Sequence, residues 1–159
     1  MQQPVSNMNN PGAEILHYCK YQERCHSEVR NKLYELGFTT PEVEQQLTNL
    51  IETGVLNEER FARAFAGGKF RMKQWGREKI KQQLKLRKIS DYCIRKAMAE
   101  IPPEDYEKAL NKLAFKKTEE IKKDRSLLSK KSKLYRYLVQ KGYERDMVMD
   151  VIKNCLETD

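Results

Sequence analysis

A threefold repeat of apolar positions is the feature of this sequence that most restricts its fold. Adding 51 to the numbers of five apolar residues in the first third of the chain gives five more apolar or aromatic residues, and adding a further 54 gives another five. The three sets are Val29, Leu33, Phe38, Val43 and Leu47; Ile80, Leu84, Ile89, Ile94 and Met98; and Leu134, Leu138, Tyr143, Val148 and Ile152. Generic helical periodicity also produces matches at some shift. Five core positions and an interhelical turn kept through three copies favour a true repeat.

The repeat predicts an all-α chain made of three tandem three-helix units. We assign residues 13–55 to repeat 1, residues 56–101 to repeat 2 and residues 102–159 to repeat 3, after a disordered tail over residues 1–12. A composition dominated by Leu, Lys, Glu, Arg and Ala agrees with helices. Three short helices are marginally stable alone, so neighbouring units should stack. We therefore expect an elongated, curved array with one concave side.

Capping residues mark several of the expected helix starts. Asn57 is followed by two acidic residues, which favours an N-cap at Asn57 and a helix beginning directly after it. Thr40 precedes a proline and an acid, so we expect Thr40 to cap the helix that contains Val43. Ser27 and Ser90 are the expected caps of two further helices.

Positive charge is concentrated in two blocks. The chain has a net charge of +8, yet residues 1–59 hold nine acidic and only four basic residues. Residues 60–90 hold eleven Lys or Arg and a single acid, and residues 108–141 hold twelve basic and three acidic residues. Such density is typical of surfaces that bind phosphate backbones or acidic protein grooves, although a solvated helix face is the common explanation for a single charged run. Because two runs recur in neighbouring repeats, we favour binding.

The basic blocks provide the candidate site residues. At 100° per residue, Arg77, Lys81, Lys85 and Lys88 fall within about 80° on one helix, which predicts a basic stripe on repeat 2. Arg63, Lys69, Arg71 and Lys73 add charge from the preceding helix, and Lys131, Lys133 and Arg136 do so in repeat 3. We predict that these eleven residues bind DNA phosphates or an acidic protein groove.

Three local features have two explanations each. Trp75 either belongs to the core or stacks on a ligand, and a lone tryptophan beside a turn is more often core. Tyr135 and Tyr137 lie among basic residues, as in single-strand binders, but one of the pair is expected to pack inward. Gly67-Gly68 indicates either close packing or a kink in its helix.

Several function classes find no support in the sequence. The sequence lacks a glycine-rich phosphate-binding loop, an HExxH motif and a nucleophile elbow. We therefore predict that the protein is not an enzyme. Four cysteines without a CxxC pair predict neither a metal, a cofactor nor a disulfide framework. No apolar run approaches the roughly 20 residues of a membrane span. The first dozen residues do not resemble a signal peptide, and we expect a cytoplasmic monomer.

Three sequence segments resemble signatures of the RecX family of bacterial recombinase regulators. LNEERFARAF, followed by WGREKIKQQL and the hinge Lys88-Ile89, resembles the central signature. CHSEVRNKLYELGF resembles the first-repeat signature, and LYRYLVQKGYERDMVMDVI resembles the last. The resemblance extends from about Ala13 to Leu156. One departure is Lys88, where the family usually has the glycine that Gly37 and Gly142 keep in the other repeats.

The resemblance implies a function that the residue patterns alone do not. Proteins of this family bind the filament of RecA on single-stranded DNA, lie in its groove, and damp strand exchange and ATPase activity in recombinational repair and the SOS response. Some also bind DNA. The residues themselves leave two alternatives open: a direct DNA-binding protein of helix-turn-helix character, and a helical scaffold without a nucleic-acid role. They also leave open whether filaments are capped or disassembled.

Overall fold

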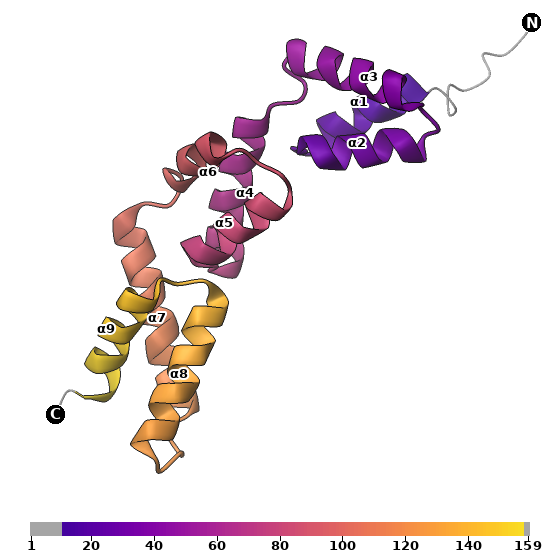
Figure 1. Cartoon of the computed structure of the whole chain (residues 1–159). Helices are drawn as coiled ribbons and strands as arrows, with labels where there is room; N and C mark the ends of the chain where they lie inside the picture. Colours follow the sequence, from indigo (N-terminus) through magenta and orange to yellow (C-terminus); the bar gives the residue numbers. More distant parts are fainter. Residues whose placement is uncertain (1–10, 158–159) are drawn as a thin grey trace, which may run out of the picture.

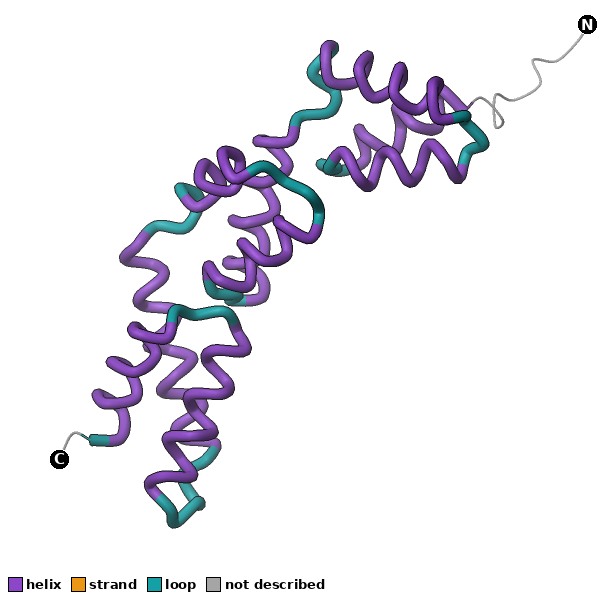
Figure 2. The backbone as a smooth tube through the Cα atoms, in the orientation of Figure 1, coloured by secondary structure: helices purple, strands orange, loops and turns teal. Residues whose placement is uncertain are grey.

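The computed structural model describes residues 11–157, which form nine α-helices and no strand (Figures 1 and 2). The predicted all-α fold class is confirmed. The helices are α1 (Pro11–Tyr21), α2 (His26–Glu35), α3 (Thr40–Glu52), α4 (Glu58–Lys73), α5 (Arg77–Leu86), α6 (Asp91–Met98), α7 (Pro103–Glu120), α8 (Leu127–Lys141) and α9 (Arg145–Leu156). The predicted tail over residues 1–12 lies outside the described residues, apart from Pro11 and Gly12, which begin α1.

The helices form three successive groups along an arc, with α1 and α9 in the groups at its two ends (Figure 1). Helices α1–α3 make the first group, α4–α6 the second and α7–α9 the third. The second helix of each group (α2, α5 and α8) lies on the concave side of the arc in this view, whereas α3, α6 and α9 lie on the convex side. Equivalent helices of the three repeats therefore share one side of the array.

The helix starts agree with the capping predictions at two positions and differ at two. Asn57 accepts a hydrogen bond from the backbone N–H of Arg60 at 2.8 Å, and Ser90 accepts one from the N–H of Cys93 at 3.2 Å. The N-cap of α3 is Thr39, so the prediction of Thr40 was wrong by one residue. Thr39 is spaced from Ser90 by the same 51 residues that separate the core positions of repeats 1 and 2.

The other difference concerns Ser27, which lies inside α2 and does not cap it. Cys25 is the N-cap instead, and the Glu28 carboxylate accepts a hydrogen bond from the Cys25 backbone N–H at 3.3 Å. The Ser27 hydroxyl donates to the carbonyl oxygen of Arg87 at 3.3 Å. A side chain expected to begin a helix therefore connects repeat 1 to repeat 2.

The turn between the second and third helices has the same hydrogen bonds in all three repeats. The residue at the centre of the turn is Gly37, Lys88 or Gly142, with φ angles of 93°, 61° and 104°. The next residue donates its N–H to the carbonyl five residues before it: Phe38 to Leu33, Ile89 to Leu84, and Tyr143 to Leu138. This pattern satisfies the last helix carbonyls and favours glycine at the left-handed position. Lys88 adopts that conformation despite its side chain.

The repeated apolar positions form the core. All of them are buried except Phe38 and Met98, which are half-buried. They belong to two separate clusters. The repeat 1 cluster lies within α1–α3 and the adjoining Leu56, whereas the second cluster runs without interruption through α4–α9 and receives Cys25 from repeat 1. Repeats 2 and 3 therefore share one core, and repeat 1 has its own.

Repeats 2 and 3 are joined through the backbone where the end of α8 meets the start of α5. The N–H groups of Gly76 and Glu78 donate to the carbonyl oxygens of Lys141 and Gly142, at 2.8 and 2.9 Å. The first N–H groups of a helix and the last carbonyls of another have no partners within their own helices. Each helix end therefore provides hydrogen-bond partners for the backbone groups of the other.

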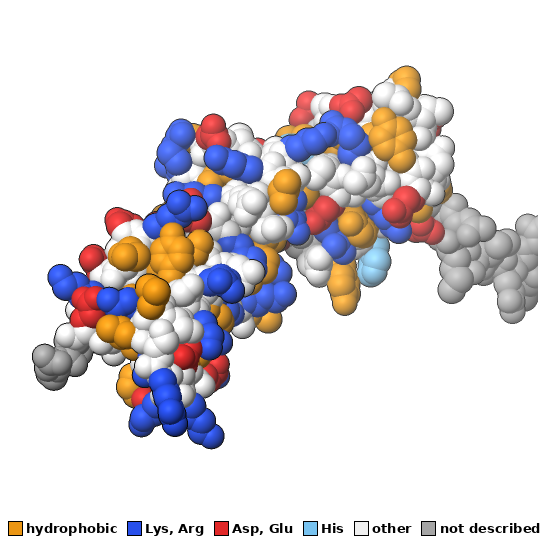
Figure 3. Space-filling view, turned by 60° about the horizontal axis from the view of Figure 1, so that its bottom comes forward, with side chains coloured by type: hydrophobic (Ala, Val, Ile, Leu, Met, Phe, Trp, Pro, Cys, Tyr) orange, Lys and Arg blue, Asp and Glu red, His pale blue; other side chains and the backbone are white. Residues whose placement is uncertain are grey.

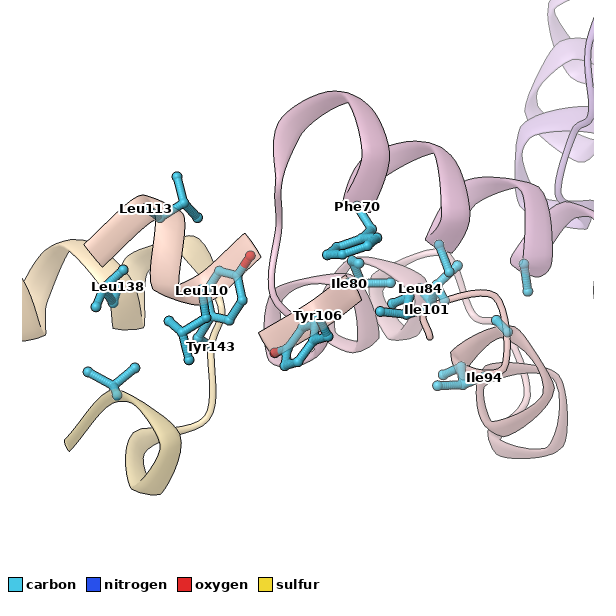
Figure 4. Packing of buried hydrophobic residues seen from close by; sticks show 14 of the residues in the cluster. Phe70, Ile80, Leu84, Ile94, Ile101, Tyr106, Leu110, Leu113, Leu138 and Tyr143 are labelled. Atoms are coloured by element: carbon cyan, nitrogen blue, oxygen red, sulfur yellow. The ribbon is translucent and has the colours of Figure 1, made fainter. Parts of the chain in front are cut away.

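Two tyrosines complete this junction (Figure 4). Tyr106 and Tyr143 lie between the apolar residues of α4–α6 and those of α7–α9, with ring centroids 5.0 Å apart. The Tyr106 hydroxyl donates to the Glu144 carboxylate and accepts from the Arg77 N–H at 3.0 Å. The Arg77 guanidinium bonds the other Glu144 oxygen, also at 3.0 Å. Burial raises the pKa of Tyr106, and the Glu144 hydrogen bond raises it further, so the neutral donor is the stable form.

The Gly67-Gly68 pair lies inside a continuous α4. Gly67 is buried, and a Cβ there would lie 2.7 Å from the guanidinium of Arg71. A Cβ on Gly68 would meet no atom within 4 Å. The close neighbour of this pair is therefore the Arg71 side chain, which contacts Gly67.

Candidate functional site

The concave-side helices of repeats 2 and 3 carry a net positive charge. Helix α8 carries five Lys or Arg and no acidic residue, and α5 carries four basic residues and one acid. Helix α3, on the convex side, carries three acidic residues and no basic one. Figure 3 shows a dense group of Lys and Arg side chains at the α7–α8 turn, where Lys122, Lys123 and Arg125 are exposed. The concave side of repeats 2 and 3 is therefore electropositive.

A cluster of cations surrounds Trp75 at the turn between α4 and α5. The ammonium groups of Lys69, Lys73 and Lys79 lie 5.1, 5.5 and 4.5 Å from the centroid of the Trp75 ring. The Trp75 ring is half-buried and packs edge-on against Phe65, with centroids 6.4 Å apart. The Arg87 guanidinium lies 4.7 Å from the Phe65 centroid. We call these six residues the Trp75 cluster. Trp75 is thus both packed against the core and in contact with cations.

The lysines of the Trp75 cluster lack carboxylate partners. Within residues 11–157, Lys69, Lys73 and Lys79 form no ion pair with a carboxylate. Burial lowers the pKa of Lys69, and the neighbouring charges of Lys73 and Arg87 lower it further. Like charges close together disfavour the charged form. An anion bound here would reverse that effect, because it would neutralise charges that now repel each other.

The predicted stripe on α5 is shorter than expected. Arg77 is bonded to Glu144 and lies 3.8 Å above the Tyr106 ring, so its side chain belongs to the junction between repeats 2 and 3. Lys81 is 4.0 Å from Glu78, a distance at which an exposed pair contributes little. Lys85 and Lys88 are exposed. Lys81, Lys85 and Lys88 therefore remain accessible to a ligand.

The other candidate residues fall into two groups. Arg71 and Arg136 are exposed and form no ion pair within the described part of the chain. Three others are bonded to carboxylates. Arg63 contacts Glu59 and Glu100, Lys131 contacts Glu157, and Lys133 lies 2.8 Å from Asp124. The Glu100 hydrogen bond is the main reason that the pKa of Arg63 is raised.

The two tyrosines among the basic residues of α8 are placed alike. Tyr135 and Tyr137 are both half-buried against the core that repeats 2 and 3 share. Lys117 lies 5.0 Å from the centroid of the Tyr137 ring. Neither ring is presented to solvent as fully as Tyr21 or Tyr92, which are 75% and 56% exposed.

Sequence reasoning missed Lys79, Arg87 and Lys141 as parts of this surface. Lys79 and Arg87 complete the Trp75 cluster, and the Lys141 ammonium donates to the carbonyl oxygen of Lys73 at 3.1 Å. These residues are brought together across the α4–α5 turn and the junction between repeats, where helical spacing gives no information. Their presence in the two basic blocks was the only signal.

Other kinds of site are not formed by the described residues. Among residues 11–157, no three His, Cys, Asp or Glu side chains are grouped in a way that could hold a metal ion. None of the helices in that range is both long and apolar enough to span a bilayer. The four cysteines are free, and three of them are buried.

Comparison with known proteins identifies the family. The model of the second three-helix domain of RecX matches residues 57–98, and that of the third three-helix domain matches residues 104–152. Together these matches cover more than half of the chain. The chain belongs to the RecX family. Each matched range lies inside one of the repeats predicted from the apolar pattern.

Curated RecX proteins are similar to most of the chain. "Regulatory protein RecX" of Clostridium perfringens (strain 13 / Type A) is 33% identical over 133 residues, which cover 83% of this chain and 62% of that protein. "Regulatory protein RecX" of Thermotoga maritima is 29% identical over 137 residues, covering 86% and 79%. The chain thus spans less than two thirds of the length of the clostridial RecX.

Solved RecX structures have the same fold. The crystal structure of RecX from Lactobacillus salivarius superposes with a TM-score of 0.80 at 23% identity, covering 91% of this chain and 94% of that one. A second crystal structure of a RecX regulatory protein gives a TM-score of 0.81 at 24% identity, covering 91% and 70%. The described part of the chain therefore has the same fold as these two RecX structures.

Proposed function

We propose that this protein regulates the RecA recombinase by binding in the groove of the RecA–single-stranded DNA filament, where it damps strand exchange and ATPase activity. Membership of the RecX family supports regulation of RecA. The curved array and its basic concave side support binding to an elongated, negatively charged assembly. The protein acts in this proposal as a monomer in the cytoplasm, without an enzymatic activity or a cofactor.

The observation that carries the proposal is the set of uncompensated cations on repeat 2. Lys69, Lys73 and Lys79 surround Trp75 without a carboxylate partner, and Lys81 and Lys85 are accessible on α5. Holding like charges together costs free energy in the unbound protein, and a bound anion would lower that cost. Repeat 2 is also central in the array, where a groove-bound partner contacts it whichever end docks first.

Inhibition of the RecA ATPase on single-stranded DNA tests the proposal. Two double variants remove the basic surface: Lys81→Glu with Lys85→Glu, and Lys69→Glu with Lys73→Glu. Central charged contacts that become desolvated contribute about 2–5 kcal/mol when one partner is removed. Each double variant is therefore expected to raise the concentration needed for half-inhibition by at least thirtyfold.

A matched control is available on α7. Lys108 and Lys112 are exposed, have the same spacing of four residues, and form no ion pair in the described part of the chain. Lys108→Glu with Lys112→Glu makes the same change in net charge and should inhibit at concentrations close to those of the wild type. Circular dichroism and melting temperature verify that all three variants fold. If both double variants on repeat 2 inhibited the RecA ATPase at the same concentrations as the wild type, the basic surface would not be the binding site.

Direct binding of single-stranded DNA is a second candidate function, which the Trp75 cluster favours. An aromatic ring among lysines is a common arrangement for stacking a base beside its phosphates. In this alternative, affinity for bare DNA falls steeply with salt, and RecA adds nothing to it. Measuring affinity with and without RecA therefore separates the two functions.

A further inference from the structure

A cavity of about 480 Å³ opens on repeat 1, outside the basic blocks. Its walls come from one face of α1, from the loop after it and from α2, and its lining residues are Ala13, Glu14, His17, Tyr18, Tyr21, Arg24 and Lys32. Pockets for small ligands in proteins have volumes of about 300–1,000 Å³. The cavity is therefore large enough for one nucleotide-sized group.

Aromatic rings form one side of this cavity. The rings of His17 and Tyr21 lie one helical turn apart on α1, with centroids 6.2 Å apart, and Tyr21 is 75% exposed. Tyr18 lies deeper and is half-buried, and burial raises the pKa of its hydroxyl. An exposed ring beside an open cavity offers a face on which a planar group can stack.

Cations form the other side. The Arg24 guanidinium lies 3.8 Å above the Tyr18 ring, and its Nε donates to the Tyr18 carbonyl oxygen at 3.1 Å. The Lys32 ammonium lies 5.7 Å from the same ring. Within residues 11–157, the ion-pair partner of Lys32 is the exposed Glu35 carboxylate, at 3.7 Å, and Arg24 forms no ion pair. Glu14 is the single acid in the lining.

The charge of repeat 1 makes this placement informative. Only four basic residues occur among residues 1–59, against nine acids. One of the four, Arg30, is paired with Glu44 at 3.1 Å. Two of the remaining three line the cavity. Two of the few cations of an acidic repeat therefore line an aromatic cavity, and α2, the helix that carries Lys32, lies on the concave side (Figure 1).

We propose that this cavity binds one nucleotide of single-stranded DNA. The base stacks on Tyr21 and His17, and the adjoining phosphate is bound by Arg24 and Lys32. Exposed rings and cations that line one cavity match a base and its phosphate better than they match an acidic peptide, which has no aromatic base to stack on the rings. Repeat 1 thus makes a direct contact with the strand that the basic blocks do not predict. The contact does not depend on RecA, so bare DNA is the appropriate probe.

Fluorescence anisotropy with a labelled oligothymidylate and the full chain tests the site. Tyr21→Ala is expected to weaken binding by about fivefold to a hundredfold, the effect of losing one stacked base. Tyr92→Ala is the matched control, because Tyr92 is 56% exposed and has Lys96 5.4 Å from its centroid, but lies on α6 of repeat 2. Lys32→Gln is expected to reduce the salt dependence of binding by about one phosphate contact.

Two further arms identify the ligand. A strand with abasic sites keeps the phosphates, so it should bind wild type and Tyr21→Ala equally weakly if stacking is the contact. Thymidine monophosphate at millimolar concentration should compete poorly if a strand, rather than a free nucleotide, is the ligand. Photocrosslinking with 5-iododeoxyuridine, followed by mass spectrometry, is expected to label α1.

The outcomes separate this inference from the proposed function. Equal affinities of Tyr21→Ala and Tyr92→Ala, together with crosslinks confined to repeats 2 and 3, would overturn the nucleotide site even if RecA inhibition is intact. Failure of the wild-type protein to inhibit RecA, with crosslinks on α1, would overturn the proposed function and leave the site standing.

Discussion

A Cβ atom on Gly76 would lie 2.2 Å from the carbonyl carbon of Gly142, 66 residues further along the chain. The φ angle of Gly76 is −75°, which any residue adopts, so glycine is needed there for close approach and not for its backbone freedom. The contact places the carbonyl end of α8 against the N–H end of α5. Because the partial charges of these two helix ends are opposite, the arrangement is electrostatically favourable. Repeats 2 and 3 are therefore connected backbone to backbone.

Gly76→Ala should destabilise the protein by more than about 2 kcal/mol, because the new methyl group overlaps a backbone that cannot move freely. Gly68→Ala is the control. Its Cβ would meet no atom within 4 Å, and replacing a helical glycine by alanine should stabilise by about 0.5–1 kcal/mol. Urea unfolding of both variants measures the two changes, and a neutral Gly76→Ala would contradict the close contact.

Lys88→Gly should stabilise the protein by about 0.5–1 kcal/mol. The φ angle of Lys88 is 61°, a left-handed conformation that costs a non-glycine residue about 1–2 kcal/mol. Part of this gain is offset by the greater flexibility of glycine in the unfolded chain. Gly37→Ala, at the equivalent turn with a φ of 93°, should lose stability by a similar amount. Both changes in stability are measurable by thermal melting. If the two substitutions changed the stability in the same direction, the turns would not be equivalent.

Repeat 1 should unfold separately from repeats 2 and 3, because the buried residues of α1–α3 form a cluster of their own and repeat 1 contributes Cys25 to the other cluster. Its junction with repeat 2 includes the Arg60–Glu23 pair at 2.5 Å. Leu33→Ala, which empties a buried site, should lower the local stability of α1–α3 by about 2–5 kcal/mol and leave α4–α9 unchanged. Hydrogen exchange measured by mass spectrometry resolves the two regions. Uniform acceleration over all helices would indicate a single cooperative unit.

Asp124 should make stability fall in acid. Hydrogen bonds from Lys133, and then from Ser129 and Ser126, hold the pKa of this carboxyl well below its usual range. A lowered folded-state pKa stabilises the fold above the unfolded pKa of about 3.9, and this contribution is lost progressively as the pH falls from that value through the lower folded-state pKa. The stability difference between wild type and Asp124→Asn should therefore be largest near neutral pH and become steadily smaller as the pH falls below about 4. Asp150→Asn, on the exposed face of α9, serves as the control.

The repeat and its core were accessible from the sequence because apolar spacing depends on local helix geometry. Leu33, Leu84 and Leu138 occupy the same place in each repeat and are fully buried. The position of the α3 cap was missed because Thr39 and Thr40 are both suitable capping residues. Only the backbone conformation distinguishes them.

The candidate site was predicted less completely, because charge patterns do not reveal partners that are distant in sequence. Arg77 belongs to the predicted stripe by its helical angle, yet Glu144 of another repeat binds it. Lys79 lies outside that stripe, yet it approaches Trp75 across a turn. Both outcomes depend on the packing of repeats, which helical periodicity does not determine.

The most direct test of the account compares two ligands at near-physiological salt. Binding of the full chain to RecA-coated single-stranded DNA and to the same DNA without RecA can be measured by co-sedimentation and anisotropy. We expect weak, salt-sensitive binding to bare DNA and much tighter binding to the filament, because only the filament has a groove that the concave side of this protein can contact. Equal affinities for the two ligands would contradict the account and establish direct DNA binding as the function.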